Sequence, residues 1–414
     1  MHSHVPSQWK TAIIHPIPKI ESPSNPADYR PISIVPVLAR MLERELVRTY
    51  MYQTFQAPPI SDLLADQYAF RPNGSTTAAL ISILHHVTTI LTEDAYVTII
   101  SLDFAKAFDT VRHSVLARKL SNLELPDCIY NWLVDFLEDR SHATRIAGRL
   151  SAFAHINASV IQGSGVGPSD FIVNASDLHP IHERNKIVKF ADDTYLIIGR
   201  SMRYTISEEL EAINEWATAN NLRLNTNKSK EMLVARRLET SILPPLIQGM
   251  ERVTEMKILG VILRGDLRAT SHVERVLRSC TGSLQALRVL RAHGLSPEAL
   301  STVARATTVS RLFYASPTWW GLTSAEDRSK LERFQRKMQR LQFLSSDIEP
   351  LTMMAEAADA RLMRAVSVND AHVLRRLFPP TAQRHYNMRP RSHPFELPAK
   401  DDRNFIPRIL YKIR

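Results

Sequence analysis

A pair of aspartates, Asp192 and Asp193, lies in the middle of a mostly apolar, β-branched segment that covers residues 186–198. Two runs of this composition separated by a tight turn predict a β-hairpin, here with the aspartates at its tip. A third run, 96–102, has the same character and is followed directly by Asp103. Strands this apolar must be buried, so the chain needs a sheet covered by other elements. If the three strands are neighbours, their carboxylates converge at one end of that sheet.

The length and composition place the chain among folded proteins of more than one domain. It has 414 residues, 44% of them apolar and 23% charged. Chains of this length usually form two or three domains, and these fractions are ordinary for globular proteins. The N-terminus has no secretory pattern and no apolar run is long enough to span a membrane, so we expect an intracellular protein of the nucleus or cytoplasm. Two distant cysteines, Cys128 and Cys280, exclude a disulfide framework and a Cys-rich zinc module.

The positive charge is concentrated in the last third of the chain. Residues 264–414 contain 26 Lys and Arg against 14 Asp and Glu, whereas residues 1–263 contain 26 against 28. A basic block next to a nearly neutral one is typical of a polyanion-binding region attached to a catalytic body. A solvated basic surface that only aids solubility is the alternative.

Hydrophobic periodicity predicts further helices and strands. We expect helices over about 36–50, 76–91 and 201–222, a helix that begins near Phe104, and strands over 155–161, 231–235 and 258–263. The last third is expected to be helical, with helix starts at the capping residues Ser296 and Ser324. The segment after Phe378 shows no clear pattern.

Carboxylates at strand ends are suited to phosphoryl transfer with metal ions. That chemistry depends on positioning and on charge neutralisation, often by two divalent ions held by oxygen ligands. Each feature has a simpler explanation when it is taken alone. An Asp-Asp pair is good turn chemistry, and Asp103 can cap a helix.

The ordered set of motifs resembles the reverse transcriptases, most closely those of non-LTR (LINE-type) retrotransposons. The resemblance spans about residues 9–263 and rests on eight segments in the order found in that family. These segments are Ala12–Lys19 and Asp28–Ser33 (fingers), Gln67–Thr76 (template contact), Leu102–Asp109 (motif A), Gln162–Pro168 (motif B), Phe190–Asp193 (motif C), Leu224–Ser229 (motif D) and Ile258–Ile262 (motif E).

The resemblance implies an RNA-directed DNA polymerase that uses two Mg²⁺ ions, with Mn²⁺ as a possible substitute. Its partners would be an RNA template, a DNA primer and dNTPs. The resemblance makes Asp103 and Asp192 the metal ligands, with Asp193 beside them as ligand or organiser. The resemblance also makes Lys228 the candidate proton donor to the leaving pyrophosphate.

Five other residues are implied to contact the incoming nucleotide. Lys19 and Arg30 match the residues that hold the triphosphate, one as a point charge and the other as a bidentate fork. Gln162 and Gly163 would pack against nucleotide and template. Phe108 would lie beneath the sugar and exclude a 2′-OH.

The implied fold is α+β, a right-hand polymerase with fingers, an antiparallel-sheet palm and a helical thumb. We expect fingers over 1–95, a palm over 96–263, a basic helical thumb or extension over 264–378, and an unassigned tail over 379–414. Because the chain begins almost at the first finger motif, we expect it to be a region of a longer open reading frame.

Several alternatives compete with this prediction. A viral-type RNA polymerase has Asp where this chain has Phe108, which argues against that class. A group II intron-type reverse transcriptase and a catalytically inactive, domesticated nucleic-acid-binding remnant both stay open. The segment Gly163–Gly167 lacks the spacing of a dinucleotide-binding loop. Its Gly165-Val-Gly-Pro168 ending also departs from the usual motif B, which leaves the packing of this turn undecided.

Overall fold

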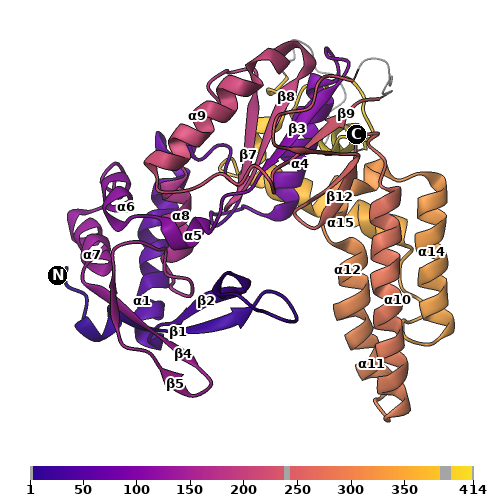
Figure 1. Ribbon diagram of the computed structural model, residues 1–414. Coiled ribbons are helices and arrows are strands. Elements are labelled where there is room, and N and C mark those ends of the chain that lie inside the picture. The colour runs from indigo at the N-terminus through magenta and orange to yellow at the C-terminus, as the bar shows by residue number, and fades with distance from the viewer. Residues whose placement is uncertain (1–2, 237–242, 383–392, 413–414) are drawn as a thin grey trace. The chain divides into compact units, whose positions relative to one another are not determined.

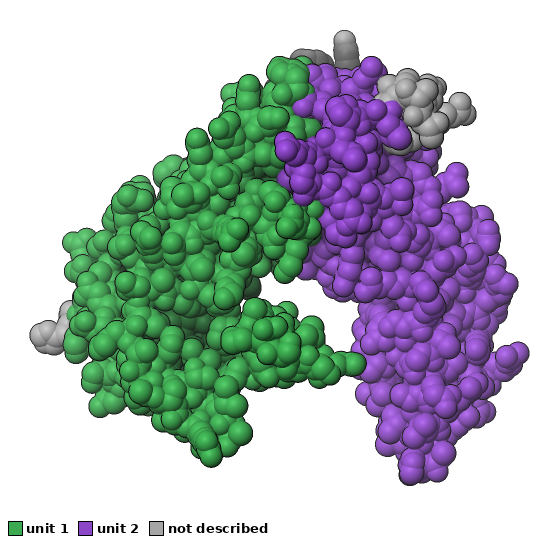
Figure 2. Space-filling view, viewed as in Figure 1, with its two compact units in different colours: residues 1–74, 101–196, 204–229 green, residues 75–100, 197–203, 230–414 purple. Residues whose placement is uncertain are grey.

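The computed structural model describes residues 3–236, 243–382 and 393–412. Within this part, the chain forms two compact units, each made of discontinuous segments (Figure 2). Unit 1 comprises residues 1–74, 101–196 and 204–229, and unit 2 comprises 75–100, 197–203 and 230–414. Strands β3 and β8 contribute residues to both units. Each unit therefore contains residues of both the expected fingers (1–95) and the expected palm (96–263). The bounds of fingers, palm and thumb remain a prediction.

Unit 1 contains most of the strands and the helices that cover them (Figure 1). Its elements are β1 (Thr11–Pro18), β2 (Tyr29–Ile34), α1 (Val37–Leu46), α2 (Tyr52–Gln56), α3 (Ile60–Leu63), α5 (Ala107–Thr110), α6 (His113–Leu120), α7 (Asp127–Leu137), β4 (Arg140–Ile146), β5 (Arg149–Leu150), β6 (Ala154–Ile156), α8 (Gly167–Asn174), β7 (Lys186–Phe190) and α9 (Ile206–Ala219). Strands β3 (Val97–Leu102) and β8 (Asp193–Gly199) are the two that it shares with unit 2.

Unit 2 is mainly helical. Its elements are α4 (Thr76–Ile90), β9 (Lys230–Val234), β10 (Glu251–Val253), β11 (Glu255–Ile258), β12 (Val261–Arg264), α10 (Thr270–Ala292), α11 (Pro297–Ala304), α12 (Ser310–Phe313), α13 (Ser316–Trp319), α14 (Ala325–Arg340), α15 (Leu351–Val368) and α16 (Phe405–Lys412). Helices α11, α12 and α14 pack against the long α10, and α4 is buried on most of its surface.

The strands form three sheets. One has the order β2-β1-β4-β5, with β6 also paired to β4, and another has the order β10-β9-β3-β8-β7. Strands β11 and β12 form a separate hairpin. In the five-stranded path through β3, the pair β9–β10 runs parallel, whereas β7 and β8 are the two arms of the predicted hairpin. Strand β3 is buried along nearly its whole length, as its β-branched composition predicts.

Several predicted elements are confirmed. The hairpin arms and the strand before Asp103 lie where the sequence places them, and the helix predicted over 76–91 is α4. Ser296 and Ser324 are the N-caps of α11 and α14. In the second case Ser324 and Asp327 form a complete capping box.

Other predictions about local structure are wrong, because the backbone groups of these segments form hydrogen bonds other than those that the predicted elements require. The strand predicted over 155–161 ends at Ile156, since the amides of Ser159 and Val160 instead donate to the carbonyls of Val111 and Phe108, at 2.8 and 2.7 Å. The segment 258–263 is the β11–β12 hairpin rather than one strand, and it turns at Leu259 and Gly260, both of which have positive φ.

Two further differences concern helices. The chain after Asp103 does not enter a helix at once, because Lys106 adopts a left-handed conformation (φ 51°) and α5 begins only at Ala107. The C-terminal segment, which has no clear sequence pattern, contains α16. This helix is held by the buried Arg408, whose guanidinium donates to both carboxylate oxygens of Asp359.

Candidate active site

A pocket of about 710 Å³ in unit 1 gathers most of the residues singled out by the sequence. The predicted residues that line it are Lys19, Arg30, Asp103, Phe108, Gln162, Gly163, Asp192 and Lys228. They come from segments that lie far apart in the chain. Asp193, the remaining predicted site residue, is not among the lining residues, although it is adjacent to Asp192 and electrostatically coupled to it.

The loop that follows β3 is held by the segment over 223–229. The amide of Asp103 donates to the hydroxyl of Ser229 at 3.2 Å, and its carbonyl accepts from the amide of Asn225 at 2.8 Å. The amide of Ala105 donates to the carbonyl of Arg223 at 2.9 Å. These bonds satisfy backbone groups that no helix or strand satisfies at this point. They also bring Lys228 to the pocket.

The carboxylates at the hairpin tip carry raised pKa values. For Asp192, burial raises the pKa, the charge of Asp103 raises it further, and the charge of Arg30 opposes the shift. For Asp193, burial together with the charges of Asp192 and Asp103 raises the pKa to about 6. Among the residues that the structure describes, none of the three carboxylates forms an ion pair. Their mutual repulsion is therefore left for a cation to relieve.

The donor chemistry fits hard divalent cations. Asp103 and Asp192 line the same pocket, and carboxylate oxygens are the ligands that Mg²⁺ prefers. In the described part of the chain, no group of three or more His, Cys, Asp or Glu side chains is placed to hold a metal ion. Two carboxylates are nevertheless enough for Mg²⁺, which usually binds one or two of them together with substrate phosphates and water.

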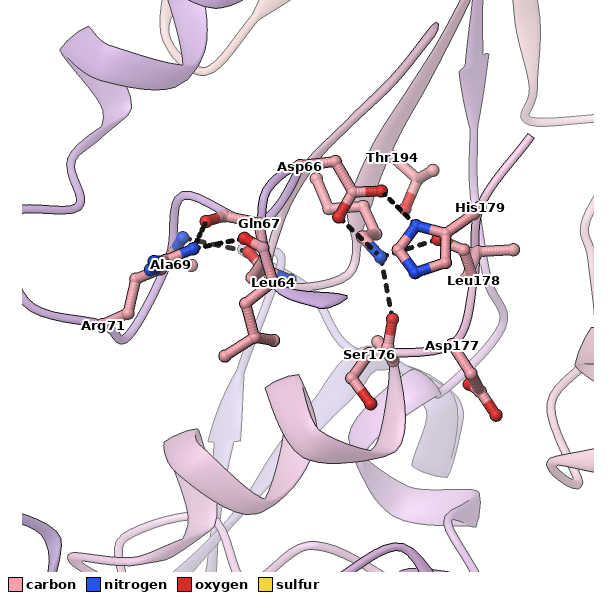
Figure 3. Close-up of polar contacts among 12 residues, drawn as sticks. Leu64, Asp66, Gln67, Ala69, Arg71, Ser176, Asp177, Leu178, His179 and Thr194 are labelled. Atoms are coloured by element: carbon pink, nitrogen blue, oxygen red, sulfur yellow. Dashed lines mark hydrogen bonds and ion pairs between the residues drawn. The ribbon is translucent and has the colours of Figure 1, made fainter. Parts of the chain in front are cut away.

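The hairpin tip is braced by a residue that the sequence alone does not place in this role. The side-chain oxygen of Gln67 accepts from the amide of Ala69 at 2.9 Å (Figure 3). The same oxygen also accepts from the amide of Ala191 at 3.1 Å. Ala191 immediately precedes Asp192 and has a left-handed conformation (φ 57°), so it needs an external support. Gln67 is buried, whereas the motif resemblance assigns its segment to template contact. Nothing in the sequence distinguishes these two roles.

The same brace extends to a buried ion pair next to Gln67 (Figure 3). The ammonium of Lys189 lies 3.0 Å from the carboxylate of Asp66 and donates to the carbonyls of Ala175 and Leu178. The imidazole of His179 also contacts Asp66, at 3.0 Å. A buried ammonium that is paired with a carboxylate and donates to two carbonyls holds its neighbours in one arrangement. In this protein, Lys189 thereby holds β7 against the segment that follows α8.

The turn at Gln162 and Gly163 is held against β2 and α5. The amide of Ser33 donates to the carbonyl of Gln162 at 2.8 Å, and the side-chain amide of Gln162 donates to Asp109 at 3.0 Å. Gly163 has φ 120°, and a Cβ there would lie 2.3 Å from the carbonyl oxygen of Ser33. Position 163 therefore tolerates only glycine.

Phe108 both faces the pocket and rests on another aromatic ring. It is half-buried, and its ring stacks on that of Phe171 from α8, with centroids 4.2 Å apart and planes inclined by 18°. Phe171 itself is fully buried. The sequence does not single out Phe171, because it lies outside the motif-like segments. The stacking on Phe171 fixes the position of the Phe108 ring. Phe108 can therefore pack against the core and line the pocket at the same time.

The predicted triphosphate-binding residues lie on the paired strands β1 and β2 and the turn between them. Lys19 directly follows β1, its amide donates to the carbonyl of Asp28, and its ammonium donates to the carbonyl of Ala27 at 3.0 Å. Arg30 is exposed on β2, in register with Ile17. Both cations therefore line the pocket from the same hairpin.

Comparison with known proteins identifies the family. The model of the family described as "Reverse transcriptase (RNA-dependent DNA polymerase)" matches residues 17–263, which is more than half of the chain. The chain belongs to the reverse transcriptase family. The predicted resemblance is thereby confirmed, including its non-LTR type.

Curated relatives of this reverse transcriptase family member come from mobile elements. It is 26% identical over 357 residues to the "Probable RNA-directed DNA polymerase from transposon X-element" of Drosophila melanogaster, covering 82% of this chain and 38% of that protein. It is 28% identical over 289 residues to the "RNA-directed DNA polymerase from mobile element jockey" of the same species, covering 66% of this chain and 31% of that protein. The chain thus spans less than two fifths of the length of these relatives.

Solved structures confirm the fold class. A telomerase from Candida tropicalis in complex with a fragment of telomeric RNA superposes with a TM-score of 0.50 at 10% identity, covering 90% of this chain and 59% of the telomerase chain. The prediction of an α+β, right-hand polymerase fold is correct. In the described residues, no helix has both the length and the apolar character that a membrane crossing requires.

The raised pKa of Asp193 gives a testable prediction. In the metal-free protein we expect this carboxyl to titrate with a pKa of about 6, and Asp192→Asn should lower that pKa by removing a neighbouring charge. Because its pKa is raised in the folded state, the Asp193 carboxyl stabilises the folded state fully at pH values below its ordinary pKa of 3.8. This stabilisation is lost as the pH rises through about 6.

Carbon-13 NMR of selectively labelled aspartate carboxyls measures this titration, with Asp193→Asn providing the assignment. The control is Asp177, whose pKa is lowered by hydrogen bonds from Lys119 and Trp216 despite opposing burial; Asp192→Asn should leave it unchanged. An Asp193 titration that does not respond to Asp192→Asn would show that the two carboxyls are not coupled.

Proposed function

We propose that this chain is the polymerase region of an RNA-directed DNA polymerase from a non-LTR retrotransposon. It extends a DNA primer along an RNA template, with dNTPs as substrates. The observation that carries the proposal is one pocket that collects residues from six of the motif-like segments, among them the carboxylates of Asp103 and Asp192 and the cations Lys19 and Arg30. The names of the X-element and jockey relatives support the same activity.

Reverse transcriptases use divalent metal ions, and here Asp103 and Asp192 would hold two Mg²⁺ ions, which Mn²⁺ can replace. When bound, the ions neutralise charge on the phosphate oxygens and activate the primer's 3′-hydroxyl. Asp193 organises the hairpin tip and adds negative charge beside the ligands. The raised pKa values of Asp192 and Asp193 in the metal-free protein support this assignment, since nearby carboxylates without a cation disfavour ionisation.

The remaining lining residues have complementary roles. Lys19 and Arg30 bind the triphosphate, Arg30 through its fork of donors. Gln162 and Gly163 pack against the nucleotide and the template base. Lys228 donates a proton to the leaving pyrophosphate. In this proposal residues 1–95 act as fingers, 96–263 as palm and 264–378 as a basic thumb, with 379–414 unassigned.

The first prediction from this function concerns the metal site. Asp192→Asn removes a charged oxygen ligand at almost constant volume, so the protein should fold and primer extension should fall by more than about a hundredfold. Extension of oligo(dT) on poly(rA) with Mg²⁺ or Mn²⁺ measures this loss, and Asp127→Asn, on an exposed helix start away from the pocket, is the matched control. Wild-type activity in folded Asp192→Asn would contradict the assignment of Asp192 as a metal ligand, and no activity in the wild type would favour an inactive remnant.

The second prediction concerns the sugar. Phe108 offers no hydrogen-bond partner to a 2′-OH and occupies the space that this group needs, so Phe108→Val should raise use of rNTP relative to dNTP by at least about tenfold. The ratio of kcat/KM for the matched dNTP and rNTP measures the change. Phe136→Leu removes a ring from another stacked pair, with Trp132, outside the pocket and should leave the ratio unaltered. An unchanged ratio in Phe108→Val would remove the argument for a DNA product.

The third prediction concerns the basic region of unit 2. Helix α14 exposes four cations, Arg333, Arg336, Lys337 and Arg340, while its apolar residues are buried. Replacing the three exposed arginines, Arg333, Arg336 and Arg340, by Gln should weaken primer–template binding and reduce the slope of log K against log salt, by up to about 0.9 for each phosphate that is no longer neutralised. Fluorescence anisotropy over a salt series measures both. The same affinity and slope in the triple variant would place the nucleic-acid grip elsewhere.

A further inference from the structure

The turn over Gly163–Gly167 is packed against helix α1 as well as against β2. Glu43 of α1 is completely buried, and its carboxylate accepts a hydrogen bond from the amide of Gly165. A Cβ at position 165 would lie 2.8 Å from the Cβ of Glu43 and 3.0 Å from the amide nitrogen of Arg44. The backbone of the turn therefore lies directly on α1, and only glycine permits this approach.

Close contacts also hold the two ends of the turn. The Ser164 hydroxyl accepts from the amide of Gly167 at 2.9 Å, next to the start of α8. A Cβ at position 167 would lie 2.8 Å from the carbonyl oxygen of Ile161. Together with the contacts of Gln162 and Gly163 to Ser33, these contacts hold both ends of the turn, and the side chain of Glu43 reaches its centre from a neighbouring helix.

Burial of the Glu43 carboxylate is unfavourable by itself. Burial raises its pKa, while hydrogen bonds from the amides of Gly165 and Val166 and the charge of Arg140 oppose the shift. Arg140 is also buried, and its guanidinium donates to the carbonyls of Phe136 and Trp9. A buried acid of this kind is weak evidence for stability, since an apolar residue of similar volume often serves as well. Its hydrogen bond to the turn points to a positioning role.

We propose that Glu43 is a positioning residue for nucleotide binding: it fixes the 162–167 turn so that Gln162 and Gly163 face the pocket. This inference rests on the function proposed above and extends it. Neither Glu43 nor α1 lines the pocket. Glu43 acts through the backbone of the turn, and its removal should affect binding of the incoming nucleotide more than chemistry.

The test is steady-state primer extension by Glu43→Ala and Glu43→Gln. Loss of a hydrogen bond to a buried carboxylate should raise KM for dNTP in Glu43→Ala by at least about tenfold, with kcat changed by less than about threefold. Glu43→Gln keeps one acceptor oxygen at almost constant volume and should recover most of the loss. Gly165→Ala, which pushes the turn away from α1, should raise KM in the same direction even if Glu43→Ala does not fold.

The matched control is Glu209→Ala. Glu209 is also completely buried in unit 1 and accepts from the amides of Ile181 and His182, at 3.1 and 3.0 Å, but it lies outside the pocket. The Glu209→Ala substitution should lower the melting temperature without raising KM for dNTP. Equal KM values in folded Glu43→Ala, Gly165→Ala and Glu209→Ala would overturn the proposal. Failure of the proposed function is distinguishable, because then the wild type itself would not extend primers or Asp192→Asn would be fully active.

Discussion

The candidate site depends on how the backbone after β3 finds its hydrogen-bond partners. The chain leaves the sheet at Asp103 without entering a helix, so its peptide groups must bond to other segments. Asn225 and Ser229 bond to Asp103 on one side, and Val160 bonds to the carbonyl of Phe108 on the other. Because these bonds join three distant segments, Lys228, Gln162 and the carboxylate of Asp103 are delivered to one pocket.

Electrostatic repulsion is the second constraint. Burial raises the pKa values of Asp192 and Asp193, and the charge of Asp103 adds to the effect. The protein holds this unfavourable arrangement with neutral and paired groups that lie behind it, such as Gln67 and the pair formed by Lys189 and Asp66. Repulsion that is maintained by packing is a common property of sites that bind divalent cations, where the ion supplies the missing charge.

Three glycines make the turn before α8 possible, each for a separate steric reason. Gly163 is pressed against Ser33, Gly165 against α1, and Gly167 against Ile161 and Ser164. Their spacing is not that of a dinucleotide-binding loop, and each is required by a contact within the protein. The close packing also explains the unusual ending of this segment, because glycine at 165 lets the turn lie on α1 and glycine at 167 permits the close contact with Ile161 and Ser164.

The sequence by itself determined the hairpin, the strand before Asp103, the fold class and the family, because these depend on local periodicity and on short motifs whose residue types are set by chemistry. It also singled out eight of the residues that line the pocket. It did not predict the early end of β6, the hairpin at Gly260, or the supporting roles of Gln67, Phe171 and Glu43. Those depend on which distant backbone groups and rings become neighbours. A buried glutamine or glutamate has no local pattern that reveals its partner, so only the tertiary structure could decide what each one holds in place.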